Sequence, residues 1–125
     1  MDIWQRGRYL DLWTLVHALS GYVTGNALIS LGLAFKTSVV IATVLFIGWE
    51  ILEYIFKNAE SFANRLVDVL ACFAGFVLAV MLPRAGFDIT NNFFLIITAC
   101  WIILLISGFL AYKERFFEAL KLKKR

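Results

Sequence analysis

Four ionisable side chains stand within long apolar stretches of this chain: His17, Glu50, Glu53 and Asp68. An acidic residue at the centre of a membrane helix costs about 2.5–3.5 kcal/mol on insertion scales, so such residues usually face a bundle interior, a partner or a water-filled cavity. Glu50 and Glu53 are three residues apart, which places them toward the same side of a helix. These four residues are therefore the first candidates for a functional site.

Three kinds of chemistry could use these groups. Three carboxylates and one imidazole can bind a divalent cation, with the oxygens suiting magnesium, calcium or manganese and the imidazole admitting zinc or iron. The same groups can carry out acid–base chemistry, such as proton exchange or hydrolysis. They can also bind a cationic or hydroxyl-rich lipid head group between aromatic walls. The residue types alone do not choose among these uses.

The composition identifies the class of protein that must position these residues. The 125 residues are 62% hydrophobic and 17% charged, with a mean hydropathy of +0.82. A soluble domain of this length leaves a large share of its surface exposed and could not hide so much apolar area. We therefore expect an all-α integral membrane protein, because lipid offers exposed backbone groups no hydrogen-bond partner.

Four apolar segments are long enough to cross a bilayer, which takes about 20 residues. Lys36 interrupts the first junction, Lys57–Ser61 forms a polar turn, and Pro83 is expected to stop the third helix. The sequence predicts a four-helix transmembrane bundle over residues 1–112, with helices at about 10–33, 37–56, 64–82 and 92–112. A basic tail, 113–125, follows it.

The lysines and arginines predict the orientation of the bundle. Ten of the twelve precede the first helix, flank the second loop or follow the last helix, which leaves only Lys36 and Arg84 for the opposite side. Cytoplasmic loops carry an excess of basic residues. Both termini are therefore expected on the cytoplasmic side of the membrane.

This orientation gives the polar residues a common depth. At about 1.5 Å per residue, all four ionisable groups fall within roughly 10 Å of the cytoplasmic boundary. Asn64 and Cys72 share a helix face with Asp68. The predicted polar cavity comprises His17, Glu50, Glu53, Asn64 and Asp68. Its predicted walls are Tyr22, Trp49, Tyr54 and Cys72.

Small residues and the tail suggest contacts outside the cavity. Membrane helices pack closely through small residues, and the predicted packing faces contain Gly21, Gly25, Ala71 and Gly75. The tail sets Phe116, Phe117 and Leu120 near one face among basic residues, as in an interfacial amphipathic helix that binds anionic lipids. Attraction to lipid accounts for the net charge of +3 without nucleic acid as a partner.

The order of these residues resembles the VanZ-like superfamily of small membrane proteins. The resemblance rests on His17 with Gly21-Tyr22, on Trp49-Glu50, and on Asp68 followed by Gly75, so it spans about half of the chain. Cys72 stands where the family pattern has an asparagine. The resemblance implies a multi-helix cell-envelope protein of the bacterial cytoplasmic (inner) membrane, with His17, Glu50 and Asp68 as its polar core. The family is named for low-level antibiotic resistance.

Three functions are compatible with these features. The first is a VanZ-like envelope protein whose cytoplasmic-side cavity binds a lipid head group, a cell-envelope precursor or an ion. The second is a small structural subunit that packs, through its small-residue faces, into a larger membrane complex or a homo-oligomer. The third is a membrane hydrolase acting on a lipid-linked substrate, with no catalytic residue assigned. A divalent cation is the only cofactor that the residue types suggest.

Overall fold

The described part of the chain is built from α-helices. The computed structural model describes residues 11–55, 61–87 and 91–123, with 114–123 described by their backbone alone. It contains four helices: α1 (Leu12–Ser30), α2 (Phe35–Ile55), α3 (Phe62–Arg84) and α4 (Asn91–Lys123). No strand occurs within these ranges. The predicted all-α class is therefore confirmed.

Helix α1 begins and ends at residues with clear local causes. The Asp11 side chain accepts hydrogen bonds from the backbone N–H groups of Trp13 and Thr14, at 2.9 and 3.2 Å, and Thr14 completes a capping box. The helix ends at Ser30, and Gly32 follows with φ of +71°. A left-handed residue of this kind commonly closes a helix. The break between α1 and α2 therefore lies before Lys36. The prediction that Lys36 forms this break is wrong, because Lys36 lies inside α2.

Helix α3 extends past the predicted stop at Pro83. Ser61 caps its N-terminus by accepting a hydrogen bond from the Asn64 backbone N–H at 3.2 Å. Pro83 lies in the last turn, and the helix ends at Arg84, with Gly86 at φ of +86°. Proline removes only one donor in that turn, and the N–H groups of Ala85, Gly86 and Phe87 bond back to carbonyls of the last turn. The polar-turn residues 57–60 lie outside the described ranges.

Helix α4 continues through the expected boundary between bundle and tail. Its backbone is helical from Asn91 to Lys123 without a break at 112. The tail sequence contains no glycine or proline, and Lys, Glu, Arg, Ala and Leu all favour helix. At about 1.5 Å per residue, the whole helix is roughly 50 Å long, which exceeds the thickness of a bilayer's hydrocarbon core. The tail is therefore an extension of α4 and not a separate helix. The side chains of Phe116, Phe117 and Leu120 lie outside the description.

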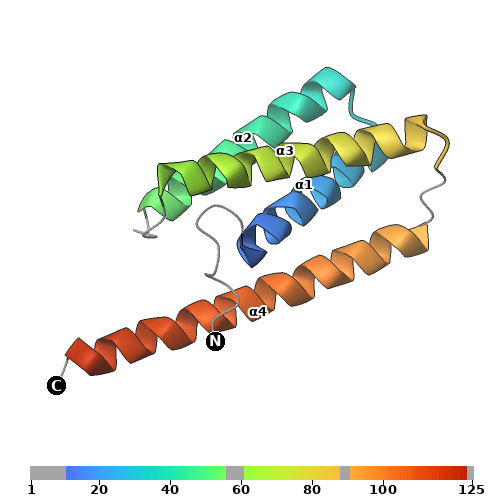
Figure 1. The fold of residues 1–125 in the computed structure, drawn as a ribbon. Helices are drawn as coiled ribbons and strands as arrows, with labels where there is room; N and C mark the ends of the chain where they lie inside the picture. The colour runs from blue at the N-terminus through green and yellow to red at the C-terminus, as the bar shows by residue number, and fades with distance from the viewer. Residues whose placement is uncertain (1–10, 56–60, 88–90, 124–125) are drawn as a thin grey trace.

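The helices alternate in direction and pack around α1. Each of the other three contacts α1, and the contact between α1 and α3 is the most extensive, whereas α4 contacts no described helix other than α1 (Figure 1). The start of α1, the end of α2, the start of α3 and the end of α4 therefore point toward one side, the left in Figure 1. We call this side the first end of the bundle and the other side the second end.

Three of the four helices are long and apolar enough to cross a membrane: α2, α3 and the Asn91–Lys113 part of α4. The expected fourth crossing, α1, does not reach that level of apolarity. The reason is its content of polar and small residues, which include His17, Asn26 and two glycines. These residues are tolerated because the other helices surround α1.

Glycines allow α1 and α3 to approach at backbone distance. A Cβ atom added to Gly21 would lie 1.8 Å from the carbonyl oxygen of Cys72, and one added to Gly75 would lie 1.9 Å from that of Ala18. A Cβ on Gly25 would lie 2.7 Å from that of Ala79. Gly21, Gly25 and Gly75 thus form the predicted small-residue packing, within the chain itself. Ala71 is only half-buried, and Ala79 takes the place expected for it.

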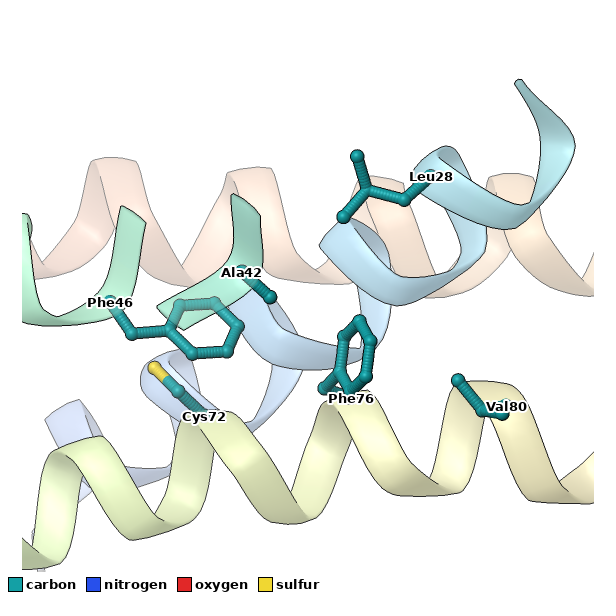
Figure 2. Packing of buried hydrophobic residues seen from close by; sticks show 6 residues of the cluster. All are labelled: Leu28, Ala42, Phe46, Cys72, Phe76 and Val80. Carbon is teal, nitrogen blue, oxygen red and sulfur yellow. The ribbon is translucent and has the colours of Figure 1, made fainter. Parts of the chain in front are cut away.

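An apolar core fills the space beside this contact. One buried cluster contains residues of three helices: Leu28 of α1, Ala42 and Phe46 of α2, and Cys72, Phe76 and Val80 of α3 (Figure 2). The Phe46 ring also packs edge-on against Phe73, with ring centroids 5.3 Å apart. This core fixes the position of α2 against α1 and α3.

Candidate metal centre

One side chain from each of α1, α2 and α3 converges in the interior, near the first end of the bundle. His17 Nε2 lies 3.4 Å from Glu50 Oε1, and His17 Nδ1 lies 3.8 Å from Asp68 Oδ1. All three residues are buried, and one ligand atom from each lies within 4.8 Å of the other two. The structure therefore brings together the three central residues of the predicted polar cavity.

The hydrogen bond at Nδ1 determines which nitrogen of His17 can bind a ligand. Nδ1 lies 2.7 Å from the backbone carbonyl oxygen of Trp13. A carbonyl oxygen can only accept, so Nδ1 must carry the proton and donate it. In the neutral imidazole, Nε2 then carries a lone pair, and this lone pair faces Glu50. A histidine that binds a metal usually donates its other ring N–H in this way.

Glu50 is a buried carboxylate with unused hydrogen-bonding capacity. It is only 8% exposed, and neither of its oxygens accepts a hydrogen bond from any described residue. His17 Nε2 also lacks a hydrogen-bond partner there. Buried polar atoms in native proteins are nearly always satisfied, so unsatisfied atoms that face one another call for a proton, a water or an ion between them.

Asn64 orients the third carboxylate. Its Nδ2 donates to Asp68 Oδ2 at 3.1 Å, and both side chains are buried. The two residues are one helical turn apart on α3, and the Ser61 cap holds the backbone of Asn64 at the start of that helix. The bond occupies Oδ2 and fixes the carboxylate plane, while Oδ1 lies toward His17. Asn64 is thus a supporting residue, as its shared helix face with Asp68 predicts.

Glu53 lies outside this cluster. It is half-buried, and its Oε1 accepts a hydrogen bond of 2.6 Å from the indole Nε1 of Trp49. Three residues correspond to about 300° of helix rotation, so Glu53 is turned some 60° away from Glu50. Of the two glutamates that were predicted to act together, only Glu50 is buried in the cluster. Glu53 is half-buried and bonds to Trp49.

The four residues predicted as cavity walls take different positions. Trp49 and Tyr54 are 42% and 66% exposed, so neither walls an interior site. The Tyr54 ring instead packs under the guanidinium of Arg65, 4.9 Å from its centroid. Tyr22 is buried and its hydroxyl has no hydrogen-bond partner among the described residues. Cys72 is buried in the apolar core.

Trp13 has a role that the sequence reasoning missed. Its carbonyl orients His17, and its ring packs edge-on against Phe109 of α4, with centroids 5.9 Å apart. A second link joins these helices, since Trp101 Nε1 donates to Ser20 Oγ at 2.8 Å. The spacing of four residues between Trp13 and His17 could have indicated this contact, because residues one helical turn apart lie next to each other.

No protein-family model, curated protein or solved structure matches this chain. The resemblance to VanZ-like proteins therefore stays a prediction from the short motifs around His17, Glu50 and Asp68.

Proposed function

We propose that this chain is a membrane protein whose helices α1, α2 and α3 together bind one divalent transition-metal ion. The ligands are His17 through Nε2 and Glu50, with Asp68 as the third, whose Oδ1 lies 3.8 Å from His17 Nδ1. The sequence left a lipid head group, a cell-envelope precursor and an ion open as the bound species, and we choose the ion. Three protein ligands leave coordination positions on that ion for water or a substrate. Such positions are characteristic of catalytic and transport sites, whereas structural zinc sites are closed.

The contact between His17 Nε2 and Glu50 Oε1 is the observation that supports this proposal most. A lone pair and a carboxylate oxygen 3.4 Å apart repel unless something positive lies between them. Two ligands of a tetrahedral zinc ion are roughly 3.4 Å apart, given metal–ligand bonds of about 2.0–2.1 Å. The pair therefore has the spacing of two ligands on one ion.

The donor set favours zinc, iron or manganese over magnesium and calcium. One imidazole and two carboxylates form a mixed nitrogen and oxygen set, and imidazole suits the transition metals. Calcium takes six to eight oxygen ligands, and magnesium keeps most of its water. The burial of all three groups also disfavours an ion that is costly to dehydrate.

A proton-holding site is the second candidate. If His17 is protonated, its Nε2–H donates toward Glu50, and the same 3.4 Å contact becomes an ion pair. A buried imidazolium between two carboxylates could pass a proton between them. This alternative predicts no effect of metals on the protein, so the two candidates separate experimentally.

The geometry bears on the subunit alternative as well. That alternative relied on Gly21, Gly25 and Gly75 to bind another protein, but these glycines lie against α3 and α1 of the same chain. A partner would therefore need a different surface.

The proposal places the ion in a membrane protein of the bacterial cytoplasmic membrane. Most basic residues precede the first helix, flank the second loop or follow the last helix, and this distribution supports an orientation with the first end toward the cytoplasm. The ion would then lie nearer the cytoplasmic side of the membrane.

Metal-dependent stability tests the proposal. Zinc at 100 times its dissociation constant should stabilise the folded protein by about 2.7 kcal/mol, and a chelator should reverse the effect. The variant His17→Gln should melt at the same temperature with and without zinc. His17 is the only histidine in the sequence, so the protein must be purified without a histidine tag. If zinc does not change the melting temperature of the unaltered protein, the metal proposal is wrong and the proton-holding site explains the cluster better.

A further inference from the structure

A cavity lies at the second end of the bundle, away from the candidate metal centre. It has a volume of about 210 Å³ and lies between the end of α1, the start of α2 and the end of α3. It is lined by Ile29, Leu33, Phe35, Ser38, Val80, Pro83 and Arg84. Along α1, Ile29 is twelve residues beyond His17, or roughly 18 Å. The two sites are therefore separate.

The cavity is mainly apolar but has two polar groups. Ser38 is 1% exposed, and its hydroxyl has no hydrogen-bond partner within the described ranges. Arg84 is exposed, and its guanidinium lies over the Phe35 ring, 5.4 Å from the centroid. No carboxylate of the described residues pairs with Arg84. A positive charge is thus held at the rim of an apolar cavity by an aromatic ring.

The first turn of α2 adds hydrogen-bond donors at the same rim. The first hydrogen bond of this helix runs from the backbone N–H of Ser38 to the Ala34 carbonyl, at 2.9 Å. The N–H groups of residues 35–37 therefore have no acceptor within the helix. No acidic side chain occupies this turn. The carbonyls at the ends of α1 and α3, in contrast, accept hydrogen bonds from the residues that follow them. The donors and Arg84 together favour an anion.

The size of the cavity restricts the ligand. A cavity of 150 Å³ holds benzene, whereas pockets for drug-sized molecules have about 300–1,000 Å³. The available 210 Å³ suits a short segment of hydrocarbon chain. A ligand that combines such a chain with an anionic group, and that reaches this position from a membrane, is a lipid.

We propose that this cavity binds one anionic phospholipid, with its phosphate between Arg84 and the first turn of α2 and part of an acyl chain inside the cavity. In this position the Ser38 hydroxyl, which lines the cavity and has no hydrogen-bond partner within the described ranges, would donate to an ester oxygen of that chain. This site does not depend on the metal ion at the other end, so either proposal can fail alone.

Lipid binding to the purified full-length chain tests the proposal. Native mass spectrometry should show one phosphatidylglycerol molecule bound at least tenfold more tightly than phosphatidylcholine with the same acyl chains. Arg84→Gln should reduce that preference about tenfold. Lys113→Gln is the control, because Lys113 is an exposed cation of α4 that does not line the cavity and lies outside the first turn of α2. If both variants lose the preference for phosphatidylglycerol equally, general charge attraction explains that preference and the proposal is overturned.

Two further measurements test the acyl chain and the phosphate separately. Ile29 is 42% exposed, so Ile29→Trp can fill the cavity without disturbing the core, and it should weaken binding of phosphatidylglycerol at least fivefold. Leu45→Trp, at an exposed position away from the cavity, should leave binding unchanged. Inorganic phosphate at millimolar concentration should not displace the lipid. Displacement by phosphate, or equal effects of the two tryptophans, would contradict the proposed site.

Discussion

Replacing Gly75 by alanine should destabilise the protein by at least about 3 kcal/mol, one methyl group being enough to separate α1 from α3. The new Cβ would lie 1.9 Å from the carbonyl oxygen of Ala18 and 2.8 Å from the backbone nitrogen of Tyr22. Overpacking of a side-chain core typically costs 1–3 kcal/mol, because side chains can shift. Here the obstacle is backbone, so whole helices must move. The midpoint of thermal unfolding in detergent should fall by about 10 °C or more.

Gly48→Ala is the matched control for this change. Gly48 lies within α2, and a Cβ atom there would meet nothing within 4 Å. Alanine is favoured over glycine in a helix by up to about 1 kcal/mol, so this variant should be as stable as the original protein or slightly more so. If Gly75→Ala and Gly48→Ala unfold at the same temperature, the close contact between α1 and α3 is wrong. The positions of His17 and Asp68 would then lose their support as well.

Glu50→Gln should abolish tight metal binding and leave the metal-free protein at least as stable as before. Glutamine keeps the size of glutamate but removes the negative charge. Loss of an outer-shell partner typically lowers metal affinity by 10–100-fold, and the loss of a ligand should exceed that, so we expect a decrease of more than 100-fold in zinc affinity. The metal-free protein should gain stability, because a buried carboxylate with no hydrogen bond from the described residues is removed.

The stability of the metal-free variant separates this account from a structural ion pair. Breaking a buried ion pair by removing one partner costs about 3–5 kcal/mol. A protein held together by a His17–Glu50 pair would therefore be strongly destabilised by Glu50→Gln, with or without zinc. Glu53→Gln is the control, because Glu53 bonds to Trp49 at the edge of α2, and its zinc affinity should change by less than threefold. Equal loss of affinity in both variants would contradict the assignment of ligands.

The sequence was sufficient to predict that His17, Glu50 and Asp68 lie at one level of the bundle, but not the direction of every side chain. Positive residues and helix breaks placed His17, Glu50 and Asp68 at one level, and their convergence follows from that level once three helices pack together. Rotation about the helix axis is a separate variable. It explains why Trp49 and Tyr54, which were predicted as aromatic walls, are exposed.

Packing partners were also only partly predictable. Ala71 and Ala79 are each four residues from Gly75, and the sequence contains nothing that distinguishes them as packing residues. The choice depends on how α1 crosses α3, which places Ala79 opposite Gly25. Similarly, Lys36 and Pro83 were reasonable helix breaks, but the chain turns at Gly32 and Gly86, where φ is positive.

The most direct test of the metal centre is to locate the ion. Crystals of the full-length protein grown with zinc should give an anomalous peak about 2.0–2.2 Å from His17 Nε2 and from one oxygen each of Glu50 and Asp68. His17 Nδ1 should remain bonded to the Trp13 carbonyl. A structure in zinc with no peak between these three side chains, and with His17 Nε2 bonded directly to Glu50, would contradict the account.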